Sequence, residues 1–458
     1  MSLTPTARTH AVVLGASMAG LLTARVLSEH FDRVTIVERD PVADRPEARK
    51  GQPQTRHLHG LLSSGMAILS GYFPDLPESL QAGGAIVSDM GEGMHWHTYG
   101  GLRVPATVGQ NAALMSRPFL EQLVRQRTLA RPNVALRDGT AAVGLLEGPG
   151  RSVAGVRVEA GEVTATLDAD LVVDCGGRGS RSPAWLRALG YPAPETSEVE
   201  VDVGYATRIF RRDPADPRGR QWLLYTPEAP RETRFGGMFP LEGDRWIVSM
   251  GGWAGDHCPT DEAGFLAYAR SLPLPEIAAV VANAEPLSDI YAYRFNLSLR
   301  RHYERLKRFP EGYLVLGDAI CSFNPTYGQG MTSAAMQAQA LDQLLHERGG
   351  RLAGMAPLFF RRAAKVVDVP WQLAVGEDFR FPQTVGKRPA GVDQLNRYVA
   401  MVHRATLRDP EVTRAFLRVM NLLAPPASLL APSVMLRVFR ANRTDRGRPL
   451  SSPRPSAG

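Results

Sequence analysis

The start of the chain alternates between apolar runs and one amphipathic stretch. Residues 10–15 (HAVVLG) form a short apolar run that ends at a glycine, which is typical of a buried strand. Residues 17–30 then carry apolar side chains at helical spacing. Residues 33–38 (RVTIVE) are rich in β-branched residues and predict a second strand. A strand, a helix and a strand in this order predict a βαβ unit that opens a parallel sheet.

The same kinds of pattern return later in the chain. Buried strands are predicted at residues 170–174 and 313–318, and helices at 116–127 and 331–347. Between about 199 and 253 the apolar positions roughly alternate. Two such runs flank the turn Glu242-Gly243-Asp244, which predicts a hairpin. The middle of the chain is therefore expected to be an antiparallel sheet inserted into a parallel α/β domain.

These patterns predict an α/β fold: a Rossmann-like dinucleotide domain, an inserted antiparallel β-sheet domain and a C-terminal helical region. We expect the dinucleotide domain to be discontinuous, over residues 1–80, 100–185 and 295–375. The substrate-binding domain is expected at 81–99 and 186–294, C-terminal helices at 376–445, and a disordered tail at 446–458.

Composition narrows the class of protein. The formal net charge is +7, but the arginines are spread along the chain, so no nucleic-acid partner is expected. The three cysteines lie far apart and form no CxxC pair, which excludes a disulfide framework and favours a reduced, cytoplasmic protein. No run approaches the roughly 18 apolar residues of a spanning helix, and no secretion signal is evident at the start, so we expect no transmembrane segment.

A glycine motif occupies the first strand-to-helix turn. Gly15, Ser17 and Gly20 stand where the dinucleotide pattern G-x-G-x-x-G has its three glycines. The first glycine permits the tight turn, the middle residue faces pyrophosphate at the helix N-terminus, and the last allows close packing. Glu38 ends the next strand, where a carboxylate accepts from ribose hydroxyls; Arg39 beside it is also expected to contact the cofactor. This pattern favours FAD or NAD over NADP.

A second segment carries related chemistry. The predicted strand at 313–318 ends at Asp318, which can accept hydrogen bonds from a polyol. A loop with Pro325, Gly328 and Gly330 then leads into the helix that begins near Met331. Backbone N–H groups at such a helix start stabilise negative charge, such as that of a reduced flavin ring.

This segment resembles the FAD-dependent monooxygenases of the p-hydroxybenzoate hydroxylase fold, through its G-D element and the following N-P-x-x-G-x-G-M loop. The resemblance implies that Asp318 binds the ribityl chain of FAD. It also implies that Pro325, Gly328, Gly330 and Met331 lie by the flavin ring. Residues 116–120 (SRPFL) resemble the helix start whose arginine contacts the cofactor, which assigns that role to Arg117.

One element departs from the family pattern. The family commonly has A-D-G after its mid-chain strand, whereas residues 175–180 here read CGGRGS. The family's aspartate helps to bind FAD and the nicotinamide donor. We therefore expect electrons from NAD(P)H to arrive through a separate flavin reductase, which would be a partner of this chain.

A narrower likeness concerns residues 50–60 (KGQPQTRHLHG), which are similar to a segment of the actinomycete polyene epoxidases of polyether biosynthesis, the lasalocid epoxidase among them. It implies an apolar small-molecule substrate. His57 and His59 in this segment are spaced like metal ligands, but no third ligand of fitting spacing is apparent, so no metal is expected.

The resemblance implies a monooxygenase that inserts one oxygen atom from O₂ through a C4a-hydroperoxyflavin, epoxidising an alkene of a polyketide or terpenoid secondary metabolite. Such chemistry needs no catalytic side chain from the protein. The alternatives are an aromatic hydroxylase, for which His95, Tyr99 or Arg208 could serve as base or donor, and a flavin-linked prenyl-chain reductase. Seven apolar residues of the inserted sheet are candidates to line the substrate pocket: Tyr205, Phe210, Trp222, Tyr225, Phe235, Met238 and Phe239.

Overall fold

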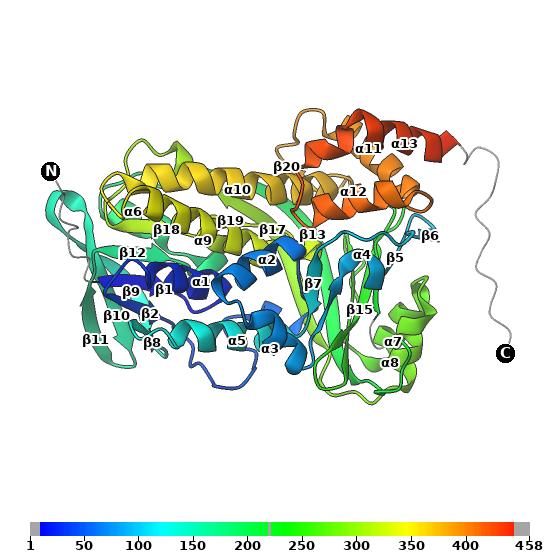
Figure 1. The fold of residues 1–458 in the computed structure, drawn as a ribbon, viewed down its shortest axis with the longest axis horizontal. Helices are drawn as coiled ribbons and strands as arrows, with labels where there is room; N and C mark the ends of the chain where they lie inside the picture. Colours follow the sequence, from blue (N-terminus) through cyan, green and yellow to red (C-terminus); the bar gives the residue numbers. More distant parts are fainter. Residues whose placement is uncertain (1–9, 219–220, 444–458) are drawn as a thin grey trace.

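A computed structural model of the chain describes residues 10–218 and 221–443, and the predicted tail at 446–458 lies outside this range. The N-terminal βαβ unit is part of a five-stranded parallel sheet, whose other strands come from later in the chain (Figure 1). Its strand order is β18 (Tyr313–Val315), β12 (Leu171–Asp174), β1 (His10–Leu14), β2 (Arg33–Val37) and β8 (Val134–Arg137). The βαβ prediction is confirmed: β1 pairs in parallel with both β2 and β12.

Four helices pack with this sheet in one hydrophobic core. They are α1 (Met18–Leu27), α5 (Arg117–Leu129), α9 (Gly330–Glu347) and α10 (Met355–Asp378). α1 packs against both α5 and α9, and α9 packs against α10. α1 and α9 each begin at one of the two glycine turns, so the packing of these helices brings the two turns to one region of the domain.

The parallel domain carries smaller elements. A meander of β9 (Ala141–Glu147), β10 (Val153–Ala160) and β11 (Val163–Asp168) follows β8, and a second small sheet joins β3 (Gly60–Leu61), β7 (Asn111–Leu114) and β4 (Ile86–Asp89). The short helices are α2 (Ser63–Tyr72), α3 (Leu76–Ala82), α4 (Met90–Gly93) and α6 (Ser182–Ala188).

The inserted sheet is the largest one, and its strands pair antiparallel except for β14 and β5, which pair in parallel. It runs in the order β19 (Cys321–Ser322), β17 (Tyr291–Arg301), β13 (Thr196–Arg211), β16 (Arg245–Trp253), β15 (Arg234–Leu241), β14 (Trp222–Tyr225), β5 (Met94–Thr98) and β6 (Gly101–Leu102), with β20 (Val385–Gly386) beside β13. The hairpin prediction is confirmed, because β15 and β16 pair across a turn in which Gly243 and Asp244 have positive φ. Helices α7 (Glu262–Ser271) and α8 (Pro275–Asn283) cover one face of the sheet.

Three C-terminal helices, α11 (Val392–Ala405), α12 (Pro410–Met420) and α13 (Pro432–Arg443), pack together against the end of the sheet that holds β5 and β14 (Figure 1). Asp409 caps α12, accepting the backbone N–H groups of Glu411 and Val412. Within the described residues, no helix is both long and apolar enough to cross a membrane.

Candidate functional site

The first glycine turn needs its glycines for steric reasons. Gly15 has a φ of +100°, and a Cβ there would lie 2.8 Å from the carbonyl oxygen of Cys175. A Cβ on Gly20 would lie 1.8 Å from the carbonyl oxygen of Gly15. Neither position accepts a side chain, because both obstacles are backbone atoms. The turn therefore holds the N-terminus of α1 close to the ends of β1 and β12, as a dinucleotide-binding turn requires.

Ser17 connects this turn to the start of α5. It is the N-cap residue of α1, but its hydroxyl makes no capping hydrogen bond. Instead, the hydroxyl donates to Glu121 over 3.2 Å and accepts from Nη2 of Arg117 over 3.0 Å. Arg117 is buried, and its Nε has no hydrogen-bond partner among the described residues. A buried guanidinium with a spare donor beside a helix N-terminus fits an anionic group.

Glu38 lies directly beside the turn. It is buried and accepts the backbone N–H of Ala16 at 2.8 Å. Arg49 bridges it to α5: Nη1 lies 3.0 Å from Glu38, and Nη2 lies 2.5 Å from Glu121. Arg39, in contrast, has an exposed side chain whose nearest carboxylate is that of Asp40, at 4.0 Å.

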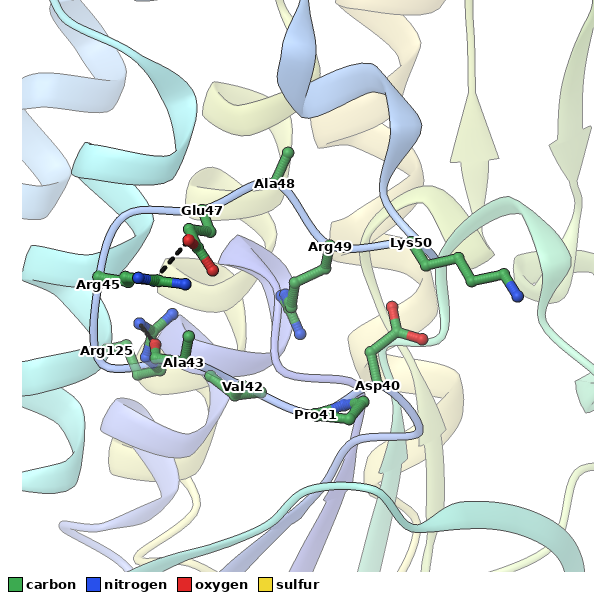
Figure 2. A pocket seen from close by; sticks show the side chains of 10 residues that line it. All are labelled: Asp40, Pro41, Val42, Ala43, Arg45, Glu47, Ala48, Arg49, Lys50 and Arg125. Atoms are coloured by element: carbon green, nitrogen blue, oxygen red, sulfur yellow. Dashed lines mark hydrogen bonds and ion pairs between the residues drawn. The ribbon is translucent and has the colours of Figure 1, made fainter.

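A cavity of about 260 Å³ adjoins Glu38 (Figure 2). The loop of residues 40–50 forms most of its wall, and Arg125 reaches into it from α5. Arg49 lines the cavity and also contacts Glu38, so the cavity flanks the end of the site where the sequence places the nucleotide ribose. Its walls carry four cationic side chains, namely Arg45, Arg49, Lys50 and Arg125.

The second turn begins directly after β18. Gly317, with a φ of +74°, starts a short 3₁₀ turn that presents Asp318. The guanidinium of Arg301 fixes this turn, since Nη1 donates to the carbonyl oxygen of Ala319 over 2.9 Å and Nη2 to that of Arg178 over 3.0 Å.

Asp318 lies between the two halves of the site. Its side chain is accessible, yet protein crowds around it, and this desolvation raises its pKa to about 6 against the opposing effect of Arg117 and Arg178. Arg117 is therefore close enough to act on Asp318 as well as on Ser17. Through Arg117, the first glycine turn at Ser17 is linked electrostatically to Asp318 in the second turn, which comes much later in the sequence.

The loop after Asp318 leaves room beside its glycines. Pro325–Tyr327 forms a 3₁₀ turn, Gly328 takes the left-handed conformation, and α9 begins at Gly330. A Cβ on either glycine would meet no described atom within 4 Å. Met331 is buried in the first turn of α9. The positive end of α9 thus has open space beside Gly328 and Gly330, as the approach of a planar anionic ring requires.

A buried carboxylate that the sequence did not single out holds this loop. Asp378, at the end of α10, is fully buried; its Oδ1 accepts from Nδ2 of Asn324 over 2.8 Å and from the hydroxyl of Tyr327 over 2.9 Å. Burial raises the pKa of Asp378 to about 7, opposed by the hydrogen bonds from Asn324 and Tyr327 and by the nearby indole of Trp253. Because the end of α10 and the loop are far apart in the chain, no local motif indicates this contact.

A continuous row of aromatic rings leads from Asp318 to Asp378. Tyr293 lies near Asp318 and Arg178, whose charges act on its pKa. The ring centroids then follow at 5.4 Å (Tyr293 to Tyr205), 6.2 Å (Tyr205 to Phe235), 5.1 Å (Phe235 to Trp253) and 4.9 Å (Trp253 to Phe381). Trp253 in turn lies beside Asp378. We refer to these five rings as the aromatic row.

His57 lies against the same face of the sheet. Its ring contacts Tyr205 edge-on, with centroids 4.9 Å apart, and its Nδ1 lies 2.8 Å from the hydroxyl of Thr207. The hydroxyl of Thr207 is in turn 2.7 Å from that of Ser249. Burial, with the nearby His59 and Arg56, lowers the pKa of His57 to about 3, so the ring is uncharged at neutral pH.

The structure separates the seven apolar residues expected to line one pocket. Only Tyr205 and Phe235 belong to the aromatic row. Phe210, Tyr225 and Met238 point to the opposite face, into the core under α7 and α8, while Trp222 and Phe239 pack in a third cluster. Side chains of a strand alternate between faces, and the sequence did not tell which parity faces the site.

The three residues offered singly as base or donor for a hydroxylase lie on different parts of the inserted sheet and its surroundings. Arg208 pairs with Glu262 of α7 at 2.6 Å. Tyr99 stacks on His403 of α11, with centroids 5.2 Å apart, and His95 lies on β5.

The turn at residues 175–179 is organised by the aspartate that precedes it. Oδ1 of Asp174 accepts the N–H of Gly176 at 2.7 Å, and Oδ2 accepts the hydroxyls of Ser180 and Ser182. Asp174 is thus occupied within the protein and buried.

Together, the donors, acceptors and open space of this site fit a flavin dinucleotide. Two helix N-termini, the spare donor of Arg117 and the open space at Gly328 and Gly330 suit anionic and planar parts. Glu38 and Asp318 are hydrogen-bond acceptors for the ribose and polyol hydroxyls between them.

Comparison with known proteins agrees with this geometry. A family model described as an FAD binding domain matches residues 8–350. Protein Rv3254 of Mycobacterium tuberculosis is 31% identical over 482 residues, covering 97% of this chain and 98% of the relative.

Two solved structures show the same fold at low identity. The flavin-dependent brominase Bmp2 is 14% identical with a TM-score of 0.66, covering 96% of this chain and 100% of its own. PqsL of Pseudomonas aeruginosa, described as a probable FAD-dependent monooxygenase, is 20% identical with a TM-score of 0.57, covering 84% of this chain and 100% of its own.

Proposed function

This chain belongs to the FAD binding domain family, and from that premise we propose that it is a flavin-dependent monooxygenase that epoxidises an alkene of an apolar polyketide or terpenoid. When bound and reduced, FAD supplies the oxygen chemistry by activating O₂. The residues proposed to hold it are Gly15, Ser17, Gly20, Glu38, Arg39, Arg117, Asp318, Pro325, Gly328, Gly330 and Met331.

One observation carries the choice of epoxidation: the aromatic row and His57 present an uncharged wall beside the site. Hydroxylation of a phenol requires a base that removes the phenolic proton. With a pKa of about 3, His57 is too weak a base for that step. Burial also raises the pKa values of Tyr205 and Tyr293, so their hydroxyls stay protonated. An alkene needs no proton removed before it accepts oxygen, which makes it the substrate that this wall suits best.

The protein's own contribution is to exclude water and to orient the substrate. The rings of Phe235 and Tyr293 are only partly buried and can bind a flat or extended apolar chain by contact. The hydroxyls of Thr207 and Ser249, linked to His57, are neutral polar groups that can fix one oxygen of a polyketide. Asp318 and Arg117 bind the cofactor instead.

We further propose that NAD(P)H delivers electrons through a separate flavin reductase. Support comes from the turn at 175–179, which has no aspartate, and from Asp174, whose carboxylate is already saturated by Gly176, Ser180 and Ser182.

The experiment is incubation of the FAD-loaded protein with an NADH-driven flavin reductase, ¹⁸O₂ and a panel of polyenes, prenylated chains and phenols. Epoxidation adds one ¹⁸O atom to a polyene and none to a phenol. Label found only in phenols would make the enzyme an aromatic hydroxylase. Products that gain two hydrogens without label would make it a reductase, and a brominated product in the presence of bromide would make it a halogenase.

A further inference from the structure

Two histidines and an aspartate meet at the far ends of α1 and α9. Nε2 of His30 lies 3.5 Å from Oδ1 of Asp342, and Nδ1 of His346 lies 3.1 Å from the same oxygen. The ligand atoms of all three side chains lie within 4.8 Å of one another. The imidazole rings are edge to face, with centroids 4.6 Å apart. We call these three residues the His–Asp–His cluster.

The three ligands come from α9 and from the turn after α1. Asp342 and His346 stand at positions i and i+4 of α9 and therefore project from one face of that helix. His30 follows the last turn of α1, where its N–H donates to the carbonyl oxygen of Leu27. α1 and α9 pack directly against each other. The cluster is thus built on the last turns of α9 and on the turn that directly follows α1.

A further side chain orients the carboxylate. The hydroxyl of Tyr72, on α2, donates to Oδ2 of Asp342 over 3.0 Å. This contact turns Oδ1 toward both imidazoles. Such an outer hydrogen bond to a ligating carboxylate is a regular feature of metal sites. His346 Nδ1 also lies 3.0 Å from the carbonyl oxygen of Asp342, so a bound cation would replace this hydrogen bond.

The local charge suits a cation. Both helices end here, and the carbonyl groups at helix C-termini carry partial negative charge. The carboxylate of Glu29, next to His30, pairs with Arg25 at 2.7 Å, so these two charges largely cancel. Asp342 keeps 18% of its side-chain surface exposed and His346 60%, which leaves an entry path and room for a water ligand.

We propose that the His–Asp–His cluster binds one Zn²⁺ ion through His30, Asp342 and His346, with water as a fourth ligand. Zinc takes nitrogen and carboxylate ligands at about 2.0–2.2 Å in a tetrahedron, which places neighbouring ligand atoms roughly 3.3 Å apart. The distances of 3.1 and 3.5 Å bracket that separation. No motif in the sequence indicates this site, because His30 and Asp342 are distant in the chain and meet only in the fold.

The ion would link the C-terminal ends of α1 and α9. α1 and α9 carry the two glycine turns at their N-termini, and the zinc would join their opposite ends. Zinc has no redox chemistry in proteins, so it would stabilise the fold without exchanging electrons with a flavin. Zinc binding at this cluster does not depend on the proposed substrate.

The test uses the FAD-loaded full chain, stripped of metal with a chelator and dialysed. Calorimetric titration with ZnCl₂ should show saturable binding of one ion per chain, and MgCl₂ should show none, because Mg²⁺ prefers oxygen ligands. Zinc should also raise the melting temperature. His346→Ala should abolish both effects; its exposed side chain makes it the variant least disturbing to the fold.

Two further variants sharpen the test. Tyr72→Phe keeps all three ligands and should weaken zinc binding by about tenfold. His257→Ala is the matched control. His257 pairs with Asp202 at 2.8 Å and belongs to no such cluster of the described residues, so its removal should leave zinc binding unchanged. Absence of one-to-one zinc binding in the parent protein, or binding that persists in His346→Ala and in Asp342→Asn, would overturn the proposal.

Discussion

Asp378→Asn should change how the stability of the protein depends on pH. Asp378 is fully buried, and its Oδ1 accepts from Asn324 and Tyr327 in the loop that leads to α9. Asparagine keeps the size of the side chain and an oxygen acceptor for these two donors, but it cannot ionise. The substitution therefore removes a titration while preserving the contacts of the loop.

The size of the effect follows from the pKa. Burial raises the pKa of Asp378 from 3.8 to about 7, so between these values the folded protein holds a proton that the unfolded chain has lost. A group whose folded pKa is raised contributes stability at low pH that is lost as pH rises through this window. From pH 5 to pH 8 the loss covers about two pH units at about 1.4 kcal/mol each, or about 3 kcal/mol. The asparagine of the variant does not titrate, so the variant escapes this loss.

The assay is urea denaturation of both proteins at pH 5 and pH 8 with saturating FAD. Subtracting the free energy of unfolding of one protein from that of the other at each pH removes the contribution of the titratable groups that both proteins share, including the histidines. The free energy of unfolding of Asp378→Asn relative to the parent should rise by about 3 kcal/mol between pH 5 and pH 8. Asp289→Asn, at an exposed aspartate, is the matched control and should show no such change. An equal difference at both pH values would refute the assignment of a buried, protonated Asp378.

Three other predictions test the cofactor site. Gly20→Ala should purify without flavin, because the new Cβ would lie 1.8 Å from the carbonyl oxygen of Gly15. The control is Gly376→Ala, inside α10, where no described atom lies within 4 Å of the new Cβ. This variant should keep its flavin, and its free energy of unfolding should increase by about 1 kcal/mol. Arg117→Ala should weaken FAD binding in equilibrium dialysis, since it removes the buried donor beside Ser17; unchanged affinity would contradict that role. NADPH alone should bleach the flavin slowly under anaerobic conditions, and added flavin reductase should restore fast bleaching; rapid bleaching by NADPH alone would reject the need for a partner.

The parts of the fold that depend on local pattern were predictable. The βαβ unit is visible because buried parallel strands are continuous apolar runs and because glycines mark the turn between them. The hairpin at residues 234–253 is visible because two alternating runs flank a glycine turn. The order of the strands in the large sheet was not predictable, since β5, β14 and β17 come from distant parts of the chain.

The candidate site shows the same division. Gly15, Ser17 and Asp318 stand in motifs that can be read in one stretch of sequence. Arg49 and Asp378 do not. Each is an ionisable residue whose role comes from a buried partner far away in the chain, which is Glu121 for Arg49 and Asn324 for Asp378. The seven lining candidates divide among separate clusters for another reason: the alternation of a strand gives two faces and does not say which one is turned to the site.

Both glycine turns together are expected to hold one FAD, and every proposed role of the site follows from that binding. The most direct measurement is to unfold the purified protein, separate the released small molecules and identify them by mass and absorbance, for the parent chain and for Asp318→Ala. We predict close to one FAD per parent chain and a colourless Asp318→Ala protein. A parent chain that releases no flavin even after reconstitution with FAD, or an Asp318→Ala protein that stays fully loaded, would contradict this assignment.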